Sequence, residues 1–259
     1  MSSVMEKDGF TLVKKGRKHK RKYKPIPADI SAQELDELEI KKFLENFTHC
    51  LIEMEQSELL HFIKSKYEKN DVEMIEKIEC LGLGSITNNK QARSQLALLV
   101  QLKLFFNCPV LAYDPIFTEA DKIVLSEFNI LVDEENTEGM KETTGKTLFF
   151  MPHCSKPLVN NILYSNWSRK LLGNVQIFGN SFENMIVRHT FQDMEKYAGY
   201  VLLSQKFVKE ISIPNNIIID NVFNDTSLHY FDNIDKLNVS FSKAIQPIYD
   251  NDELDFIKK

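Results

Sequence analysis

The chain has 259 residues, of which 43% are hydrophobic and 27% charged, and its formal net charge is −5. This composition is that of a globular protein, and no apolar stretch reaches the roughly 20 residues that a membrane-spanning helix needs. We therefore expect no membrane span. The four cysteines lack the spacing of a disulfide framework or a zinc site, so we expect free thiols, a reducing compartment and no metal.

Residues 1–28 form the first predicted unit, a disordered basic tail. The segment Lys14 to Lys24 carries eight Lys or Arg and no acidic residue, and removing those eight from 32 leaves 24 basic against 37 acidic residues. The acidic remainder argues against a nucleic-acid surface on the folded part, so any such contact should involve the tail. We expect the tail to be a nuclear-localisation or polyanion-binding element, the alternative being a solvated extension, and the protein to be cytoplasmic and nuclear.

Residues 29–76 are predicted to be a helical N-terminal extension. A first helix begins at Ser31, whose spacing to Glu34 fits a capping box, and apolar residues recur at helical spacing from Ile40 to Leu51. A second helix around Leu59 ends before Lys69. Neither helix carries a reactive group of residues.

The next stretch, Glu79 to Phe106, predicts a buried strand, a turn with two glycines and a long amphipathic helix. Gly82 and Gly84 allow close backbone approach, and amides at the helix start would favour an anion. A three-glycine dinucleotide motif would place its third glycine at position 87, where this chain has Thr87. A plain strand-to-helix turn therefore remains an open alternative.

The second predicted strand ends at Asp114, which is followed by Pro115. An acid at this position holds ribose hydroxyls in many nucleotide-binding sheets, although it usually lies about 20 residues after the glycines and Asp114 lies 32 after Gly82. The alternative role is to cap the turn before a helix over residues 116–128.

Strands and helices continue to alternate after Asp114, which predicts an α/β fold with a mostly parallel, Rossmann-like sheet and flanking helices. Strands are expected at residues 129–132, 147–154 and 175–178, and also at 200–203 and 217–220. His153, Asn180 and Ser181 lie at strand ends. Because ligands in such sheets lie outside the carboxyl ends of the strands, we expect Gly82, Gly84, Asp114, His153 and Asn180 to converge in one cleft. Residues 232–259 are predicted to be a polar tail.

Five short motifs occur in order along residues 77–231: GLGSI with ARSQLALL, YDP, MPHC, GNSF and FNDTSLHYF. Together they resemble the Sensitivity to Red Light Reduced family, the SRR-like domain proteins. The resemblance implies a Rossmann-like domain linked to circadian-clock regulation and haem-related metabolism, with no established reaction. The motif residues of the family are here Gly82, Gly84, Ser85, Arg93, Gln95, Asp114, His153, Asn180, Ser181, Asp225, Thr226, Ser227 and His229.

Two functions remain open. The leading one is a regulatory binding module with protein partners and a small nucleotide-like ligand, its cofactor unknown. The alternative is an enzyme that uses a nucleotide-like ligand or S-adenosylmethionine. A methyltransferase motif would place an acid two positions before Gly82, where this chain has Cys80. His153 and Cys154 adjoin each other in an expected strand and would point to opposite faces, which argues against a shared metal or nucleophilic site.

Overall fold

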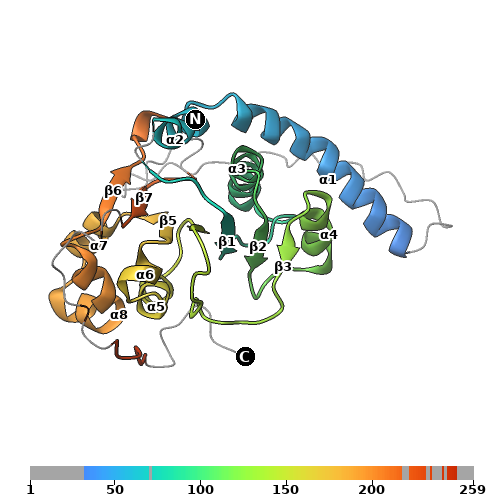
Figure 1. The fold of residues 1–259 in the computed structure, drawn as a ribbon. Helices are drawn as coiled ribbons and strands as arrows, with labels where there is room; N and C mark the ends of the chain where they lie inside the picture. The colour runs from blue at the N-terminus through green and yellow to red at the C-terminus, as the bar shows by residue number, and fades with distance from the viewer. Residues whose placement is uncertain are drawn as a thin grey trace, which may run out of the picture.

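The computed structural model describes residues 32–69, 72–217, 222–231, 234, 241 and 244–249, with side chains from residue 38 onward. One mixed β-sheet lies between two groups of helices (Figure 1). The basic tail, with its proposed localisation signal, lies outside the described residues, as does the predicted cap at Ser31. Within the described part of the chain, no helix is both long and apolar enough to cross a membrane.

The sheet has the strand order β3-β2-β1-β4-β5-β7-β6. Strands β1, β2, β4 and β5 pair in parallel, which confirms the predicted Rossmann-like arrangement, and β3 pairs in parallel with β2. Strand β7 is antiparallel to both β5 and β6. The bounds are β1 Lys77–Leu81, β2 Val110–Tyr113, β3 Leu131–Val132, β4 Thr147–Met151, β5 Val175–Asn180, β6 Lys209–Ser212 and β7 Thr226–Tyr230.

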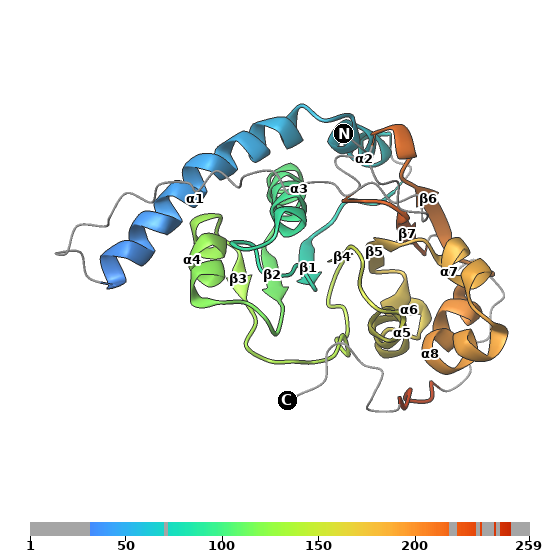
Figure 2. The ribbon, with the colours of Figure 1, turned by 180° about the vertical axis from the view of Figure 1, so that it is seen from behind.

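Helices cover the two faces of the sheet in separate groups, as the two opposite views show (Figures 1 and 2). Alternate strand residues divide between the two cores: Phe150 joins the core beneath α1 to α4, and Phe149 joins the core beneath α5, α7 and α8. The helices are α1 Ala32–Glu55, α2 Glu58–Glu68, α3 Lys90–Phe106, α4 Glu119–Glu127, α5 Lys156–Ser165, α6 Arg169–Leu172, α7 Phe182–Arg188 and α8 Phe191–Ser204, with a 3-10 helix at Asn215–Ile217.

The N-terminal helices pack on the same core as α3. Phe47 of α1 and Tyr67 of α2 are buried within that core. The Tyr67 hydroxyl donates to Gln176 Oε1 of β5 over 2.9 Å, and Gln176 Nε2 donates to the Glu73 carbonyl over 2.8 Å. Burial raises the pKa of Tyr67, so this hydroxyl stays protonated and remains a donor. The helical extension is thus joined to the sheet by hydrogen bonds as well as by apolar packing.

One of the predicted strands is wrong. Residues 200–203 belong to α8, which Thr190 caps by accepting a hydrogen bond from the Asp193 amide over 3.2 Å. A short apolar run has the same appearance in a buried strand and in a buried helix, and tertiary packing decides between them. The other prediction, a strand at residues 217–220, falls mostly outside the described part, which ends here at Ile217, the last residue of a 3-10 helix. Strands β7 and β6 complete the sheet at this edge.

The connection from β3 to β4, residues 133–146, contains no helix and crosses the sheet as an extended loop. Lys141 anchors it: its ammonium lies 2.6 Å from the Asp133 carboxylate and 3.3 Å from that of Glu79, a buried residue of β1. Lys77 pairs with the other Glu79 oxygen at 2.7 Å. A buried carboxylate is stable only when paired, and this pairing holds the loop against the sheet.

Candidate functional site

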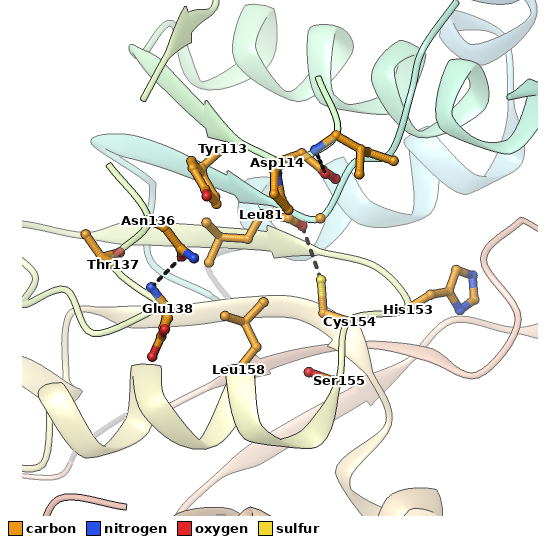
Figure 3. A pocket seen from close by; sticks show the side chains of 14 residues that line it. Leu81, Tyr113, Asp114, Asn136, Thr137, Glu138, His153, Cys154, Ser155 and Leu158 are labelled. Carbon is orange, nitrogen blue, oxygen red and sulfur yellow. Dashed lines mark hydrogen bonds between the residues drawn. The ribbon is translucent and has the colours of Figure 1, made fainter. Parts of the chain in front are cut away.

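A pocket of about 250 Å³ opens at the carboxyl ends of the parallel strands (Figure 3). Its walls come from the ends of β1, β2 and β4 and from the loop after β3. The chain passes outward in one direction from β1 through β2 to β3 and in the other from β4 to β5, so the pocket lies where the strand order reverses. This switch point is the usual ligand position in open α/β sheets.

The glycine turn after β1 forms one wall of the pocket. Gly82 has φ +69° and Gly84 has φ +80°, a backbone conformation that side chains make costly. A Cβ atom on Gly82 would lie 2.6 Å from Cys154 Sγ, whereas one on Gly84 would meet nothing closer than 3.7 Å. Gly82 is therefore needed both for its conformation and for its small size.

Asp114 ties the end of β2 to this turn. Its Oδ2 accepts a hydrogen bond from the Gly84 amide over 2.7 Å, and its Oδ1 accepts one from the Ile116 amide over 3.0 Å. A carboxylate has about four acceptor positions, so two remain for a ligand. Both readings of Asp114 derived from the sequence thus have a basis in the geometry: it holds the turn, and it lines the pocket.

The Gly84 amide is consequently occupied. Helix α3 begins only at Lys90, where Asn89 caps it by accepting from the Gln91 amide over 2.8 Å. The Gly84 amide of the turn and the Gln91 amide of the helix start are therefore already bonded, to Asp114 and Asn89, and are not free to bind an anion.

The start of α5 forms the wall after β4. Ser155 lines the pocket at the N-cap position, yet its side chain does not cap the helix, and its buried hydroxyl oxygen has no hydrogen-bond partner. A buried hydroxyl without a partner is uncommon and indicates space for a polar ligand atom or water. Beside it, the Cys154 thiol donates to the Leu81 carbonyl over 3.2 Å. Burial, followed by the charge of Asp114, raises the pKa of Cys154 to about 12, so this thiol is a weak nucleophile.

The fourth wall is the loop segment Asn136 to Gly139. A hydrogen bond joins the backbone of this loop to helix α5: Asn161 donates from Nδ2 to the Glu138 carbonyl over 2.8 Å. The Glu138 amide donates to Asn136 Oδ1 over 3.0 Å, a bond drawn in Figure 3. The Glu138 carboxylate forms no hydrogen bond or ion pair with any residue that the structure describes.

His153 and Asn180 differ from the expectation of a shared cleft. The His153 imidazole points away from the pocket in Figure 3, and its Nε2 lies 2.5 Å from the Val222 carbonyl oxygen. The backbone of His153 is left-handed, with φ +61°, and atoms of this residue other than the imidazole line the pocket. Asn180 supports the turn from behind: its Oδ1 accepts from the His153 amide over 3.1 Å, and its Nδ2 donates to the Cys154 carbonyl over 2.9 Å.

Three further predicted site residues, Ser85, Arg93 and Ser181, also lie outside the pocket wall. Arg93 donates to the carbonyls of Ile86 and Thr87 over 3.1 and 2.6 Å and so fixes the loop before α3. Ser85 accepts from the Asn88 side chain over 3.0 Å. Ser181 caps α7 by accepting from the Asn184 amide over 3.1 Å. These residues build the scaffold of the site.

The C-terminal motif forms a separate cluster on β7 and α7. Asp225 pairs with Arg188 at 2.6 Å, and Thr226 begins β7. Ser227 and His229 are fully buried. The Phe182 amide donates to His229 Nε2 over 3.3 Å, and His229 Nδ1 lies 3.2 Å from the Ile177 carbonyl oxygen. The motif thus joins α7 to the sheet. No group of three or more His, Cys, Asp or Glu that could hold a metal occurs among the described residues.

Sequence reasoning missed part of the pocket. Tyr113 and the loop segment Asn136 to Gly139 line it but were not named as site residues. Their signal was position: Tyr113 ends β2, and the acidic loop follows β3 at the same edge of the sheet.

Comparison with protein families identifies the chain. The model of the SRR1 domain matches residues 40–230. The chain belongs to the SRR1 family. The match includes all four pocket walls and the C-terminal motif, and it confirms the resemblance seen in the sequence.

Curated relatives agree with this assignment. The SRR1 domain here is 33% identical to an SRR1-like protein of Drosophila melanogaster over 61% of this chain and 55% of the relative. It is 37% identical to an SRR1-like protein of Mus musculus over 48% of this chain and 52% of the relative. It is 29% identical to protein SENSITIVITY TO RED LIGHT REDUCED 1 of Arabidopsis thaliana over 58% and 56%. The matches thus span little more than half the length of these relatives.

Two solved structures are similar at low identity. The 23S rRNA methyltransferase ErmE matches with a TM-score of 0.39 and 12% identity over 62% of this chain and 63% of that chain. The methyltransferase PaMTH1 of Podospora anserina, bound to SAH, matches with a TM-score of 0.38 and 13% identity over 71% and 88%.

Proposed function

We propose that this SRR1 domain is a regulatory binding module that takes a nucleoside-like ligand in the pocket between the ends of β1, β2 and β4. The observation that carries the proposal is the unpartnered Ser155 hydroxyl, buried in the wall of a pocket at the switch point of the sheet. A pocket with several polar groups that lack partners is arranged for a ligand that supplies them.

Apolar and polar groups are distributed over this pocket as a nucleoside requires. Leu81, Ile116 and Leu158 offer apolar surface for a planar base, and Ile116 is 58% exposed although hydrophobic. Asp114 retains two acceptor positions for hydroxyl groups, as a ribose needs. Tyr113 adds a hydroxyl that forms no hydrogen bond with the residues the structure describes.

The test is a thermal-shift screen of the full chain against adenosine, guanosine, cytidine and uridine, with S-adenosylmethionine, nicotinamide cofactors and haem beside them. A ligand at 100 times its dissociation constant stabilises the folded state by about 2.7 kcal/mol. Ser155→Ala should melt like the parent and respond less to the same ligand. Ser126→Ala is the matched control, since this exposed serine of α4 lies outside the pocket wall, and it should respond to the ligand like the parent. The proposal fails if no nucleoside stabilises the parent.

Methyl transfer from S-adenosylmethionine is the second candidate, and one observation favours it. The pocket wall contains two carboxylates, Asp114 and Glu138, and no Lys or Arg, which suits a sulfonium cation. Methyl transfer would also require an acceptor nucleophile at the pocket. Incubation with methyl-labelled cofactor and cell extract would distinguish turnover from binding, because a binding module transfers no label.

The role in the cell follows from the family as a further proposal. The resemblance connects these domains with circadian-clock input and haem-related metabolism, and we propose that the bound ligand sets the affinity of the module for a protein partner. Neutralising pocket residues should remove the effect of the ligand on this affinity and leave the partner contact itself intact, whereas changing the partner surface should abolish the contact. A pull-down with and without the ligand identified by the screen would test this proposal.

A further inference from the structure

The charged side chains of the pocket wall limit which nucleoside-like ligands can bind there. This inference rests on the proposed function. Of the 14 residues that line the pocket, two are acidic and none is Lys or Arg. The one histidine among them directs its imidazole to the Val222 carbonyl instead of the pocket. A phosphate group would therefore meet two negative charges and no positive side chain.

Two backbone amides at positions that bind phosphate in many nucleotide sites are also occupied. The Gly84 amide donates to Asp114, and the Gln91 amide at the start of α3 donates to Asn89. Helix α5 does begin at the pocket, but the partial charge at a helix start is about half an elementary charge, which is less than the two full charges of Asp114 and Glu138. Its second residue, Pro157, also lacks an amide hydrogen.

The cations nearest to the pocket are engaged elsewhere. Lys141 pairs with Glu79 and Asp133 beneath the loop, and Lys156 lies 2.6 Å from Asp193 of α8. The negative charge of the pocket also affects Tyr113. Burial, and then the charges of Asp114, Asp133 and Glu138, raise the pKa of its hydroxyl. The Glu138 carboxylate has no partner among the described residues.

We propose that the pocket selects a nucleoside-like ligand that carries a positively charged group, with Glu138 as the residue that determines this selectivity and Asp114 holding the hydroxyls. A cation opposite an unpaired carboxylate gains a charge-assisted hydrogen bond, whereas an anion at the same place is repelled. The pocket therefore discriminates against nucleotides in favour of cationic nucleosides.

Three probes that differ only at the 5′ position test the proposal: adenosine, 5′-amino-5′-deoxyadenosine and adenosine 5′-monophosphate, titrated into the full chain by calorimetry at pH 7. We expect the ammonium compound to bind about tenfold more tightly than adenosine, equivalent to about 1.4 kcal/mol, and the phosphate to bind at least tenfold more weakly. Higher ionic strength should reduce both differences.

Glu138→Gln keeps the size of the side chain and removes its charge, and it should bring the ammonium and adenosine affinities within about threefold of each other. Glu135→Gln is the matched control, since this exposed glutamate lies on the same loop outside the pocket wall. It should bind the three probes in the same order of affinity as the parent. Equal binding of the phosphate, or an unchanged order in Glu138→Gln, overturns the inference and leaves the proposed function standing. If none of the three adenosine probes binds, the inference is overturned; the proposed function fails as well only when no nucleoside of the thermal-shift screen stabilises the chain.

Discussion

The Gly84 amide and the Asp114 carboxylate are joined by a hydrogen bond of 2.7 Å, so the acid at the end of β2 holds the turn that follows β1. The two residues are 30 positions apart. The same carboxylate also accepts from Ile116. Asp114 therefore sets the shape of the pocket before any ligand enters.

Replacing Asp114 should reveal this structural role. Asp114→Ala leaves the Gly84 and Ile116 amides without their acceptor, and we expect a loss of roughly 1.5 to 3 kcal/mol in the free energy of unfolding, measured in urea. Asp114→Asn retains an acceptor and should lose less. Equal stability of parent and Asp114→Ala would show that the two hydrogen bonds contribute nothing.

The two glycines of the turn should respond differently to alanine. Gly84→Ala should lower the free energy of unfolding by about 1 to 2 kcal/mol, because alanine is unfavourable in a left-handed backbone. Gly82→Ala should lose a similar amount for the same reason, and in addition it places its Cβ 2.6 Å from Cys154 Sγ. Removing that sulfur with Cys154→Ala should recover the steric part, so a double-mutant cycle should give a favourable coupling energy. Additive effects in the cycle would contradict the contact.

Glu210 should make the free energy of unfolding depend on pH. Burial raises the pKa of this carboxyl, but the side chains of Ser181, Ser227 and His229, whose Nε2 lies 3.6 Å from Glu210 Oε2, outweigh burial and lower the pKa from 4.5 to about 2. Because the folded pKa is depressed, the stabilisation is present above pH 4.5 and is lost as pH falls toward 2.

Urea unfolding at pH 6 and at pH 3 measures this dependence. Glu210→Gln should be less stable than the parent at pH 6, and the gap should narrow at pH 3. Glu183→Gln is the control, because its side chain is exposed and only its amide contacts Glu210, over 3.1 Å. A gap of constant size between Glu210→Gln and the parent would disprove the assignment.

Tyr249 connects the C-terminal segment to the helix beneath the pocket loop. Asn160 donates to its hydroxyl over 2.9 Å, and the hydroxyl donates to Asn161 Oδ1 over 2.8 Å. Both asparagines are buried, so Tyr249→Phe leaves two polar atoms without this partner and should cost about 1 to 3 kcal/mol. Tyr164→Phe removes a hydroxyl with no such bond in the described structure and should be nearly neutral. Similar losses for both variants would argue against the hydrogen bonds.

The sequence predicted those strands and helices that depend on local sequence pattern alone. The apolar runs of β1, β2, β4 and β5 alternate with segments that contain helices, and this alternation implies parallel pairing because parallel strands need long crossovers, which are usually helical. The same logic places the ends of these strands at one edge, and Gly82 and Asp114 do line one pocket there. Residues 200–203 were misassigned because an apolar run of that length satisfies two patterns.

Side-chain direction was decided by tertiary structure. His153 turns away from the pocket because a left-handed backbone sends its ring to the Val222 carbonyl, a contact between residues 69 positions apart. Glu138 enters the pocket wall because Lys141 anchors its loop to Glu79, 62 positions away. Sequence by itself determined which residues reach the edge of the sheet, since periodicity and turn chemistry are local. Contacts between distant segments decided which of them face the ligand, since local pattern carries no information about such contacts.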